Sequence, residues 1–173
     1  MNAVRTTLAL AALALGTLAA IAASPLPPLA GDEVAAVDLA VWLRDRRAGL
    51  LVVDARSAEA MAHDRLPGAR RLADVDTAML HAADTVVVYA DRDVDARLLD
   101  TLRRSAGTRY LRLHGGIEAW NDDVRYPVVR GDASAAQRQR FETRAQLSRY
   151  FGGTPRRLDP GAANGRPRSR QGC

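Results

Sequence analysis

Thr85-Val86-Val87-Val88-Tyr89 is an uninterrupted run of β-branched and aromatic residues, the residue types that favour a β-strand. The run has no polar alternation, which is typical of a strand covered on both faces of a sheet. Leu50-Leu51-Val52-Val53 is a second run of the same kind. Parallel sheets bury their strands in this way, so the two runs predict a parallel sheet with helices on both faces.

Helical patterns and weaker strands lie around these two runs. Ser57 and Asp76 are predicted N-caps of two short helices, and Asp93 or Asp95 is predicted to begin a longer one. The predicted helices cover residues 34–47, 57–62, 76–82 and 95–105, with a further one that includes Ile117 and Trp120. Weaker strands are predicted at residues 69–72 and 110–113. Repeated β–α units of this kind predict an α/β fold.

Four segments give the chain a resemblance to a known family. Val53-Asp54-Ala55-Arg56 resembles the Val-Asp-x-Arg strand end of rhodanese-like domains, and Leu66-Pro67-Gly68-Ala69 resembles their Pro-Gly-Ala turn. Residues 113–120 resemble the family's Leu-x-Gly-Gly-x-x-x-Trp segment, and residues 126–129 resemble its closing Pro-Val strand. The matches follow the family's order and spacing over residues 33–130. The resemblance implies a rhodanese-like three-layer fold, with a central parallel sheet between two layers of helices.

Ala90 occupies the position that matters most for activity. The resemblance implies that sulfurtransferases of this family place a cysteine directly after the strand that corresponds to Thr85–Tyr89. That cysteine takes up a sulfane sulfur as a persulfide, which inward-pointing backbone N–H groups of the loop stabilise. A methyl group cannot act as a nucleophile. We therefore expect the nucleophile position to be vestigial and the chain to lack sulfurtransferase activity.

The loop after this position is acidic where the family holds an anion. The candidate pocket loop consists of Ala90, Asp91, Arg92, Asp93, Val94 and Asp95. Its three aspartates would repel thiosulfate, so restoring the cysteine alone should not restore efficient catalysis. We interpret the aspartates as caps of the following helix, one of which could fill the former anion site.

A metal site in this loop is the alternative interpretation, because Asp-x-Asp-x-Asp also opens calcium-binding loops. The match fails at Ala96, where the turn glycine belongs, and at Leu102, where the bidentate glutamate belongs. We expect neither a metal nor a cofactor. Asp54, Arg56 and His114 are predicted at the rim of the pocket, since the carboxyl ends of parallel strands face the ligand.

The two ends of the chain differ from this domain. Residues 1–23 have one early charge, Arg5, followed by an apolar run and small residues, which predicts a secretory signal peptide or an uncleaved anchor. Residues 24–32 are a predicted linker. We therefore expect the protein to be exported, either into the periplasm or held at the inner membrane facing it.

The C-terminal part is predicted to be a helical extension over residues 131–155, followed by a basic disordered tail at residues 156–173. Residues 131–173 hold nine arginines and three acidic residues, whereas the domain before them is nearly neutral. This charge favours a solvated tail, with contact to an anionic membrane surface or an acidic partner as the alternative. Nucleic acid is not an expected partner, since only the tail is basic.

Three functional hypotheses follow. The first is a non-catalytic module that binds a protein or a small ligand outside the cytoplasm. The second is an enzyme of another kind that uses Asp91, Asp93 and Asp95 or His114 in the modified pocket. The third is a residual sulfurtransferase that acts through Cys173, the single cysteine of the chain.

Overall fold

The protein is seen here as a computed structural model, which describes residues 31–104 and 108–159. The predicted signal segment, most of the predicted linker and residues 160–173, with Cys173, lie outside the described residues.

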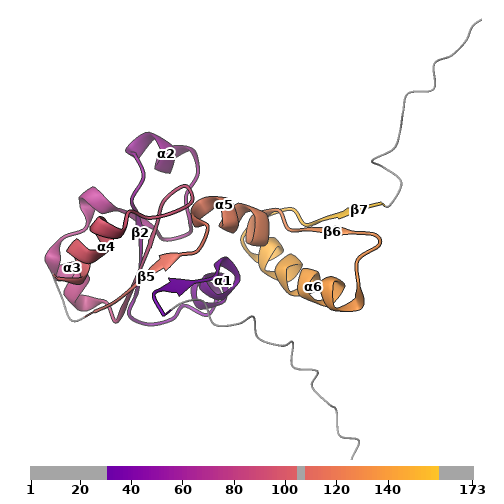
Figure 1. The fold of residues 1–173 in the computed structure, drawn as a ribbon, viewed down its shortest axis with the longest axis horizontal. Helices are drawn as coiled ribbons and strands as arrows, with labels where there is room; N and C mark the ends of the chain where they lie inside the picture. Colours follow the sequence, from indigo (N-terminus) through magenta and orange to yellow (C-terminus); the bar gives the residue numbers. More distant parts are fainter. Residues whose placement is uncertain (1–30, 105–107, 160–173) are drawn as a thin grey trace, which may run out of the picture.

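A five-stranded sheet forms the centre of the main domain, with the strand order β1-β5-β4-β2-β3 (Figure 1). All neighbouring strands are parallel, which confirms the predicted sheet. The middle strand, β4, has every residue buried, as its unbroken run of apolar residues predicts. The five strands are β1 (Glu33–Val34), β2 (Leu50–Asp54), β3 (Arg70–Arg71), β4 (Thr85–Tyr89) and β5 (Arg109–Leu113).

Helices cover both faces of the sheet, so the domain has three layers. Alternate residues of β4 point to opposite faces, as the period of two in a strand requires. Val87 and Tyr89 pack into one core cluster with Leu39 and Trp120. Val86 and Val88 pack into a second cluster with Leu99. The helices are α1 (Ala36–Arg44), α2 (Ala58–His63), α3 (Thr77–Ala82), α4 (Ala96–Arg103) and α5 (Gly116–Trp120), with the 3₁₀ turn η1 (Leu72–Asp74) and the π-helical turn η2 (Asn121–Arg125).

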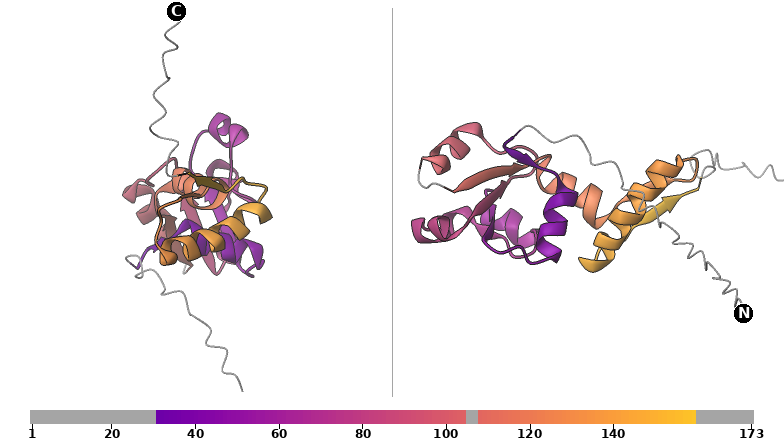
Figure 2. Two further views of the ribbon diagram at one scale, coloured as in Figure 1. Left: turned by 90° about the vertical axis from the view of Figure 1, so that its right-hand side faces the viewer. Right: turned by 90° about the horizontal axis from the view of Figure 1, so that it is seen from below.

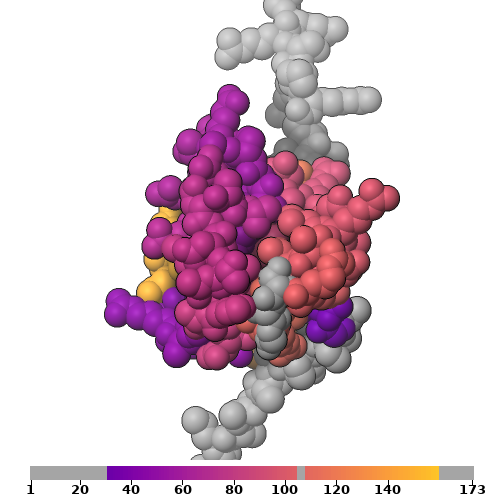
Figure 3. Space-filling model, turned by 90° about the vertical axis from the view of Figure 1, so that its left-hand side faces the viewer, coloured from indigo at the N-terminus to yellow at the C-terminus, as the bar shows by residue number. Residues whose placement is uncertain are grey.

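An extension continues from η2 and projects from one end of the sheet domain (Figures 1 and 2). It consists of β6 (Val128–Arg130), α6 (Ala135–Tyr150) and β7 (Arg156–Leu158). The edge-to-face contact of Trp120 with Phe151, at 5.3 Å between ring centroids, joins it to the sheet domain. The opposite end of the molecule is formed by the sheet domain (Figure 3).

One prediction about the extension was wrong. Residues 156–158 were expected to begin a disordered tail, but they form β7 and pair in parallel with β6. The chain turns back after α6, where the Gly153 N–H donates to the Ser148 carbonyl at 2.7 Å and the Thr154 N–H donates to the Arg125 carbonyl at 2.8 Å. Within the described residues, no helix combines the length and the apolar character needed to cross a membrane.

Candidate functional site

A buried carboxylate lies at the carboxyl end of β2. Asp54 is completely inaccessible to solvent. One of its oxygens accepts hydrogen bonds from the Tyr89 hydroxyl at 2.6 Å and from Arg56 Nη2 at 2.8 Å. The other accepts from the Arg56 backbone N–H at 2.9 Å and from Arg56 Nε at 3.0 Å. Asp54 was predicted at the rim of the pocket, but it lies in the interior. Its charge is tolerated there because every one of these hydrogen bonds pairs it.

The burial and the hydrogen bonds of Asp54 shift both its own pKa and the pKa of Tyr89. Burial raises the pKa of Asp54, but the hydrogen bonds from Arg56 and Tyr89 outweigh that effect and hold it below its ordinary value. Burial, together with the hydrogen bond to Asp54, raises the pKa of the Tyr89 phenol well above its ordinary value. At neutral pH Asp54 is therefore an anion and Tyr89 is a neutral donor.

Arg56 connects this carboxylate to two other segments. Its side chain is 6% exposed, and its Nη2 also donates to the backbone carbonyl of Asp64, which ends α2. Its Nη1 lies 3.6 Å from a carboxylate oxygen of Asp91 in the loop after β4. The guanidinium stands 5.3 Å from the centre of the Tyr89 ring. The protein's own groups thus take up the hydrogen-bonding capacity of Arg56.

The loop after β4 is held against the start of α5. The carbonyl of Ala90 accepts the Ile117 N–H at 3.0 Å, and that of Asp91 accepts the Glu118 N–H at 3.2 Å. A Cβ atom on Gly116 would lie 2.4–2.7 Å from the carbonyl oxygens of residues 90–92, so the approach requires glycine. The backbone N–H groups of residues 91–96 make no hydrogen bond to any other part of the chain that the structure describes.

The three loop aspartates have different surroundings. Asp95 caps α4, since its carboxylate accepts the Arg97 N–H at 2.8 Å, which confirms the predicted capping role for this residue. Asp91 has a side chain that is 74% exposed, although it faces Arg56, and Asp93 is exposed. Val94 is buried beneath α4. In residues 31–104 and 108–159, no three Asp, Glu, His or Cys side chains gather closely enough to hold a metal ion.

His114 directly follows β5, at the carboxyl end of that strand, and it faces the neighbouring edge strand β1. Its Nδ1 is 3.3 Å from a carboxylate oxygen of Glu33 in β1, and its side chain is 59% exposed. Neither Glu33 nor Tyr89 was predicted as part of the site. A tyrosine at the end of a wholly buried strand was the available signal, because its hydroxyl requires an internal partner.

Comparison with known proteins identifies the main domain. Residues 39–123 match the family model of the Rhodanese-like domain. The chain carries a rhodanese-like domain. The match ends within η2, so β6, α6 and β7 lie outside it. No curated protein matches the chain.

Two solved structures resemble the fold of this rhodanese-like domain. The BH2092 protein of Bacillus halodurans is 24% identical, with 51% of this chain and 70% of that chain covered and a TM-score of 0.43. RPA3614 of Rhodopseudomonas palustris, described as a protein of unknown function and possible tyrosine phosphatase, is 16% identical, with 56% of this chain and 95% of that chain covered and a TM-score of 0.41.

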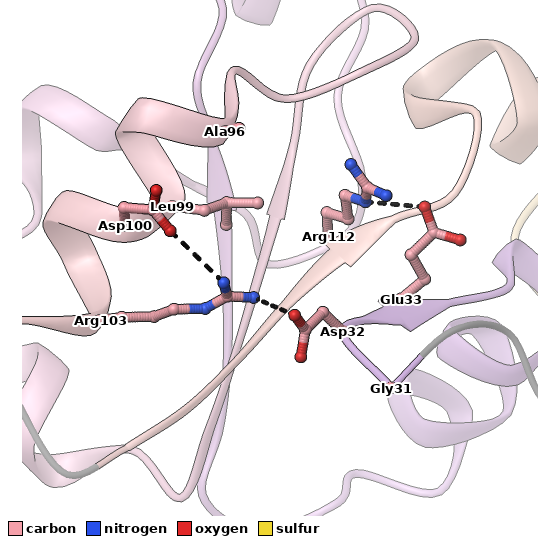
Figure 4. Close-up of a pocket in the computed structure, with 8 residues that line it drawn as sticks. All are labelled: Gly31, Asp32, Glu33, Ala96, Leu99, Asp100, Arg103 and Arg112. Carbon is pink, nitrogen blue, oxygen red and sulfur yellow. Dashed lines mark ion pairs between the residues drawn. The ribbon is translucent and has the colours of Figure 1, made fainter.

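A cavity of about 180 Å³ lies between β1, β5 and α4 of the rhodanese-like domain (Figure 4). Its charged lining residues pair with one another. Arg103 lies 2.7 Å from Asp32 and 3.6 Å from Asp100, and Arg112 lies 2.7 Å from Glu33. Because these internal pairs satisfy its charges, the cavity offers little to an ionic ligand.

Proposed function

We propose that this protein is an exported rhodanese-like module that binds a partner and does not transfer sulfur. Ala90 is the observation that carries the proposal. It follows β4 directly, at the position where the resemblance places the catalytic cysteine. Sulfur transfer needs a thiolate that attacks the donor, and a methyl group has no electron pair to give. The chain's single cysteine, Cys173, is 83 positions further along the sequence.

The surroundings of Ala90 support the same proposal. Arg56 lies beside the loop, where Asp54 and Asp91 take up its charge, and Arg92 within the loop pairs with Glu118 at 2.5 Å. An incoming thiosulfate would have to compete with these carboxylates for either guanidinium, and it would meet their negative charge. Ion binding at this position is therefore weak even before the missing nucleophile is considered.

The loop keeps groups that suit binding without chemistry. The backbone N–H groups of residues 91–96 have no acceptor in the described parts of the chain, and residues 91–93 are exposed. Exposed main-chain donors on a loop fixed at both ends can bind carbonyl or carboxylate oxygens of a partner. The signal-like segment at residues 1–23 supports a place of action outside the cytoplasm.

A thiosulfate:cyanide sulfurtransferase assay of the purified protein tests the proposal, with the Cys173→Ser variant assayed beside it. We expect thiocyanate formation at the level of the buffer blank for both proteins. Activity in the wild-type protein that disappears in Cys173→Ser would instead establish a sulfurtransferase that works through Cys173. Export is tested separately, by fractionating cells that express the full chain and locating the protein with an antibody.

A further inference from the structure

The extension contains a groove of about 540 Å³ between β6 and α6, and all its lining residues lie outside the match to the rhodanese-like family model. Val129 and Phe141 form its apolar floor, and both are more than nine-tenths buried. Arg130, Arg140 and Arg144 contribute its cations. Figure 1 shows β6 between β7 and α6, and no residue of β7 lines the groove. The groove therefore follows the side of β6 that faces away from β7.

The hydrogen bonds to β7 identify which main-chain groups of β6 are already used. The Arg156 N–H donates to the Pro127 carbonyl at 2.9 Å, and the Gly131 N–H donates to the Leu158 carbonyl at 2.8 Å. In a parallel ladder, alternate residues of a strand bond the same neighbour. Val129 lies midway between these two bonds, so its main-chain groups also face β7.

Val128 and Arg130 consequently present their main-chain groups at the opposite edge. Among the described residues β7 is the one strand that pairs with β6, so no described strand lies at that edge. The carbonyl of Arg130 accepts the Ala133 N–H at 3.1 Å. The N–H groups of Val128 and Arg130 and the Val128 carbonyl have no hydrogen-bond partner in the described parts of the chain. Unpaired main-chain groups of this kind are a template for an additional strand.

The charge of the groove selects the kind of strand that fits. Arg130 pairs with Asp132 at 3.1 Å, and Arg144 pairs with Asp123 at 2.9 Å. Arg140 is exposed, and it has no ion pair or hydrogen bond with another residue that the structure describes. The groove lining thus holds three arginines and one aspartate, an excess of positive charge beside an open strand edge.

We propose that this groove binds an extended acidic segment of another protein, which adds to the free edge of β6 as a third strand. Main-chain hydrogen bonds to Val128 and Arg130 would align the segment, and Arg140 would contact an acidic side chain. Alternate side chains of the segment would rest on Phe141. The chain's own residues 160–173 are a poor occupant, because they contain three arginines and no acidic residue. Ala90 does not line the groove. The proposed binding of an acidic segment can therefore be tested separately from the proposed absence of sulfur transfer.

The test uses a fluorescent peptide of alternating glutamate and valine, titrated into the purified protein and followed by polarisation. A peptide with lysine in place of glutamate is the control ligand. Arg140→Glu reverses the unpaired charge and should weaken binding about fivefold or more. Arg149→Glu makes the same change at an exposed position of α6 outside the groove, and it should leave the affinity unchanged.

A second variant and a second measurement address the strand edge. Val128→Pro removes a donor that faces the groove, and proline is tolerated at a free strand edge. It should abolish binding without changing the thermal unfolding midpoint. In amide NMR spectra, the acidic peptide should shift the signals of Val128 and Arg130 more than that of Val129.

Three outcomes would overturn the proposal: no binding of the acidic peptide at millimolar concentration, equal binding of the lysine peptide, or equal losses in Arg140→Glu and Arg149→Glu. Binding to anionic phosphatidylglycerol vesicles that Arg140→Glu abolishes, with no peptide binding, would assign the groove to membranes instead. Peptide-independent dimerisation in sedimentation experiments that Val128→Pro abolishes would assign it to a second copy of the chain.

Discussion

Two buried tyrosines on neighbouring strands of the sheet provide a matched test of the interior. The Tyr89 hydroxyl of β4 donates to Asp54 at 2.6 Å and accepts the Leu66 N–H at 3.3 Å. The Tyr110 hydroxyl of β5 is also buried, but it has no hydrogen-bond partner among the residues that the structure describes. Replacing each tyrosine by phenylalanine removes one oxygen and leaves the ring in place.

The two substitutions should differ clearly in magnitude. Tyr89→Phe removes a hydrogen bond to a charged acceptor, worth about 1.5–3 kcal/mol, and leaves the buried Leu66 N–H without its acceptor, at a cost of about 1–3 kcal/mol. Arg56 still neutralises Asp54, so the two effects overlap, and we expect a loss of about 2–4 kcal/mol in the free energy of unfolding. Tyr110→Phe removes a buried polar atom that has no partner, so we expect no loss, or a gain of about 1 kcal/mol.

Urea unfolding at neutral pH, followed by far-ultraviolet circular dichroism, measures both changes. Equal m-values for the three proteins would show that the unfolded states are comparable. A loss below about 0.5 kcal/mol for Tyr89→Phe, within the range of ordinary surface substitutions, would refute the argument that this hydroxyl holds the buried carboxylate in place. A larger loss in the free energy of unfolding for Tyr110→Phe than for Tyr89→Phe would also refute this role of the Tyr89 hydroxyl.

Three further substitutions test the loop and its support. Asp54 has a lowered pKa, so its contribution to stability is present above its unfolded pKa of about 3.9 and is lost as the pH falls through its folded pKa. The urea midpoint of Asp54→Asn should therefore fall less than that of the wild type on acidification below about pH 5, and equal falls would contradict this. Gly116→Ala should cost more than about 3 kcal/mol in urea unfolding, because its Cβ would lie 2.4 Å from a carbonyl oxygen, whereas Gly68→Ala, with a similar positive φ but open space, should cost about 1 kcal/mol. Ala90→Cys, made with Cys173→Ser, should show little thiocyanate formation, and adding Asp91→Ser should increase it; efficient transfer by Ala90→Cys without the Asp91 change would contradict the role given to that aspartate.

Local sequence signals were sufficient for most of the sheet domain. Ser57 and Asp76 were predicted as N-caps, and each accepts a backbone N–H from the first turn of its helix, at 3.1 and 2.8 Å. The unbroken apolar run of β4 predicted a strand buried on both faces, which the two core clusters confirm. These features depend on residues a few positions apart, so they can be inferred before the fold is known.

Features that depend on distant contacts could not be inferred in this way. Arg156–Leu158 consists of two arginines and a leucine and has no strand pattern, and it becomes a strand because the turn after α6 places it beside β6. The placement of Asp54 depends on Tyr89, 35 residues later in the chain. His114 faces Glu33 because β1 and β5 are neighbours at the sheet edge, a pairing across most of the domain.

The surroundings of Asp54 would keep this fold stable whether or not a nucleophile follows β4. Asp54, Arg56 and Tyr89 connect β2, β4 and the end of α2, and each contact among them is internal to the protein. Removing one member would leave a buried charge or a buried donor without a partner, which is a large cost to stability. These residues are thus required by the fold whether or not sulfur is transferred. The Val-Asp-x-Arg resemblance therefore indicates the fold alone, and the proposed absence of sulfur transfer rests on the side chain that follows β4.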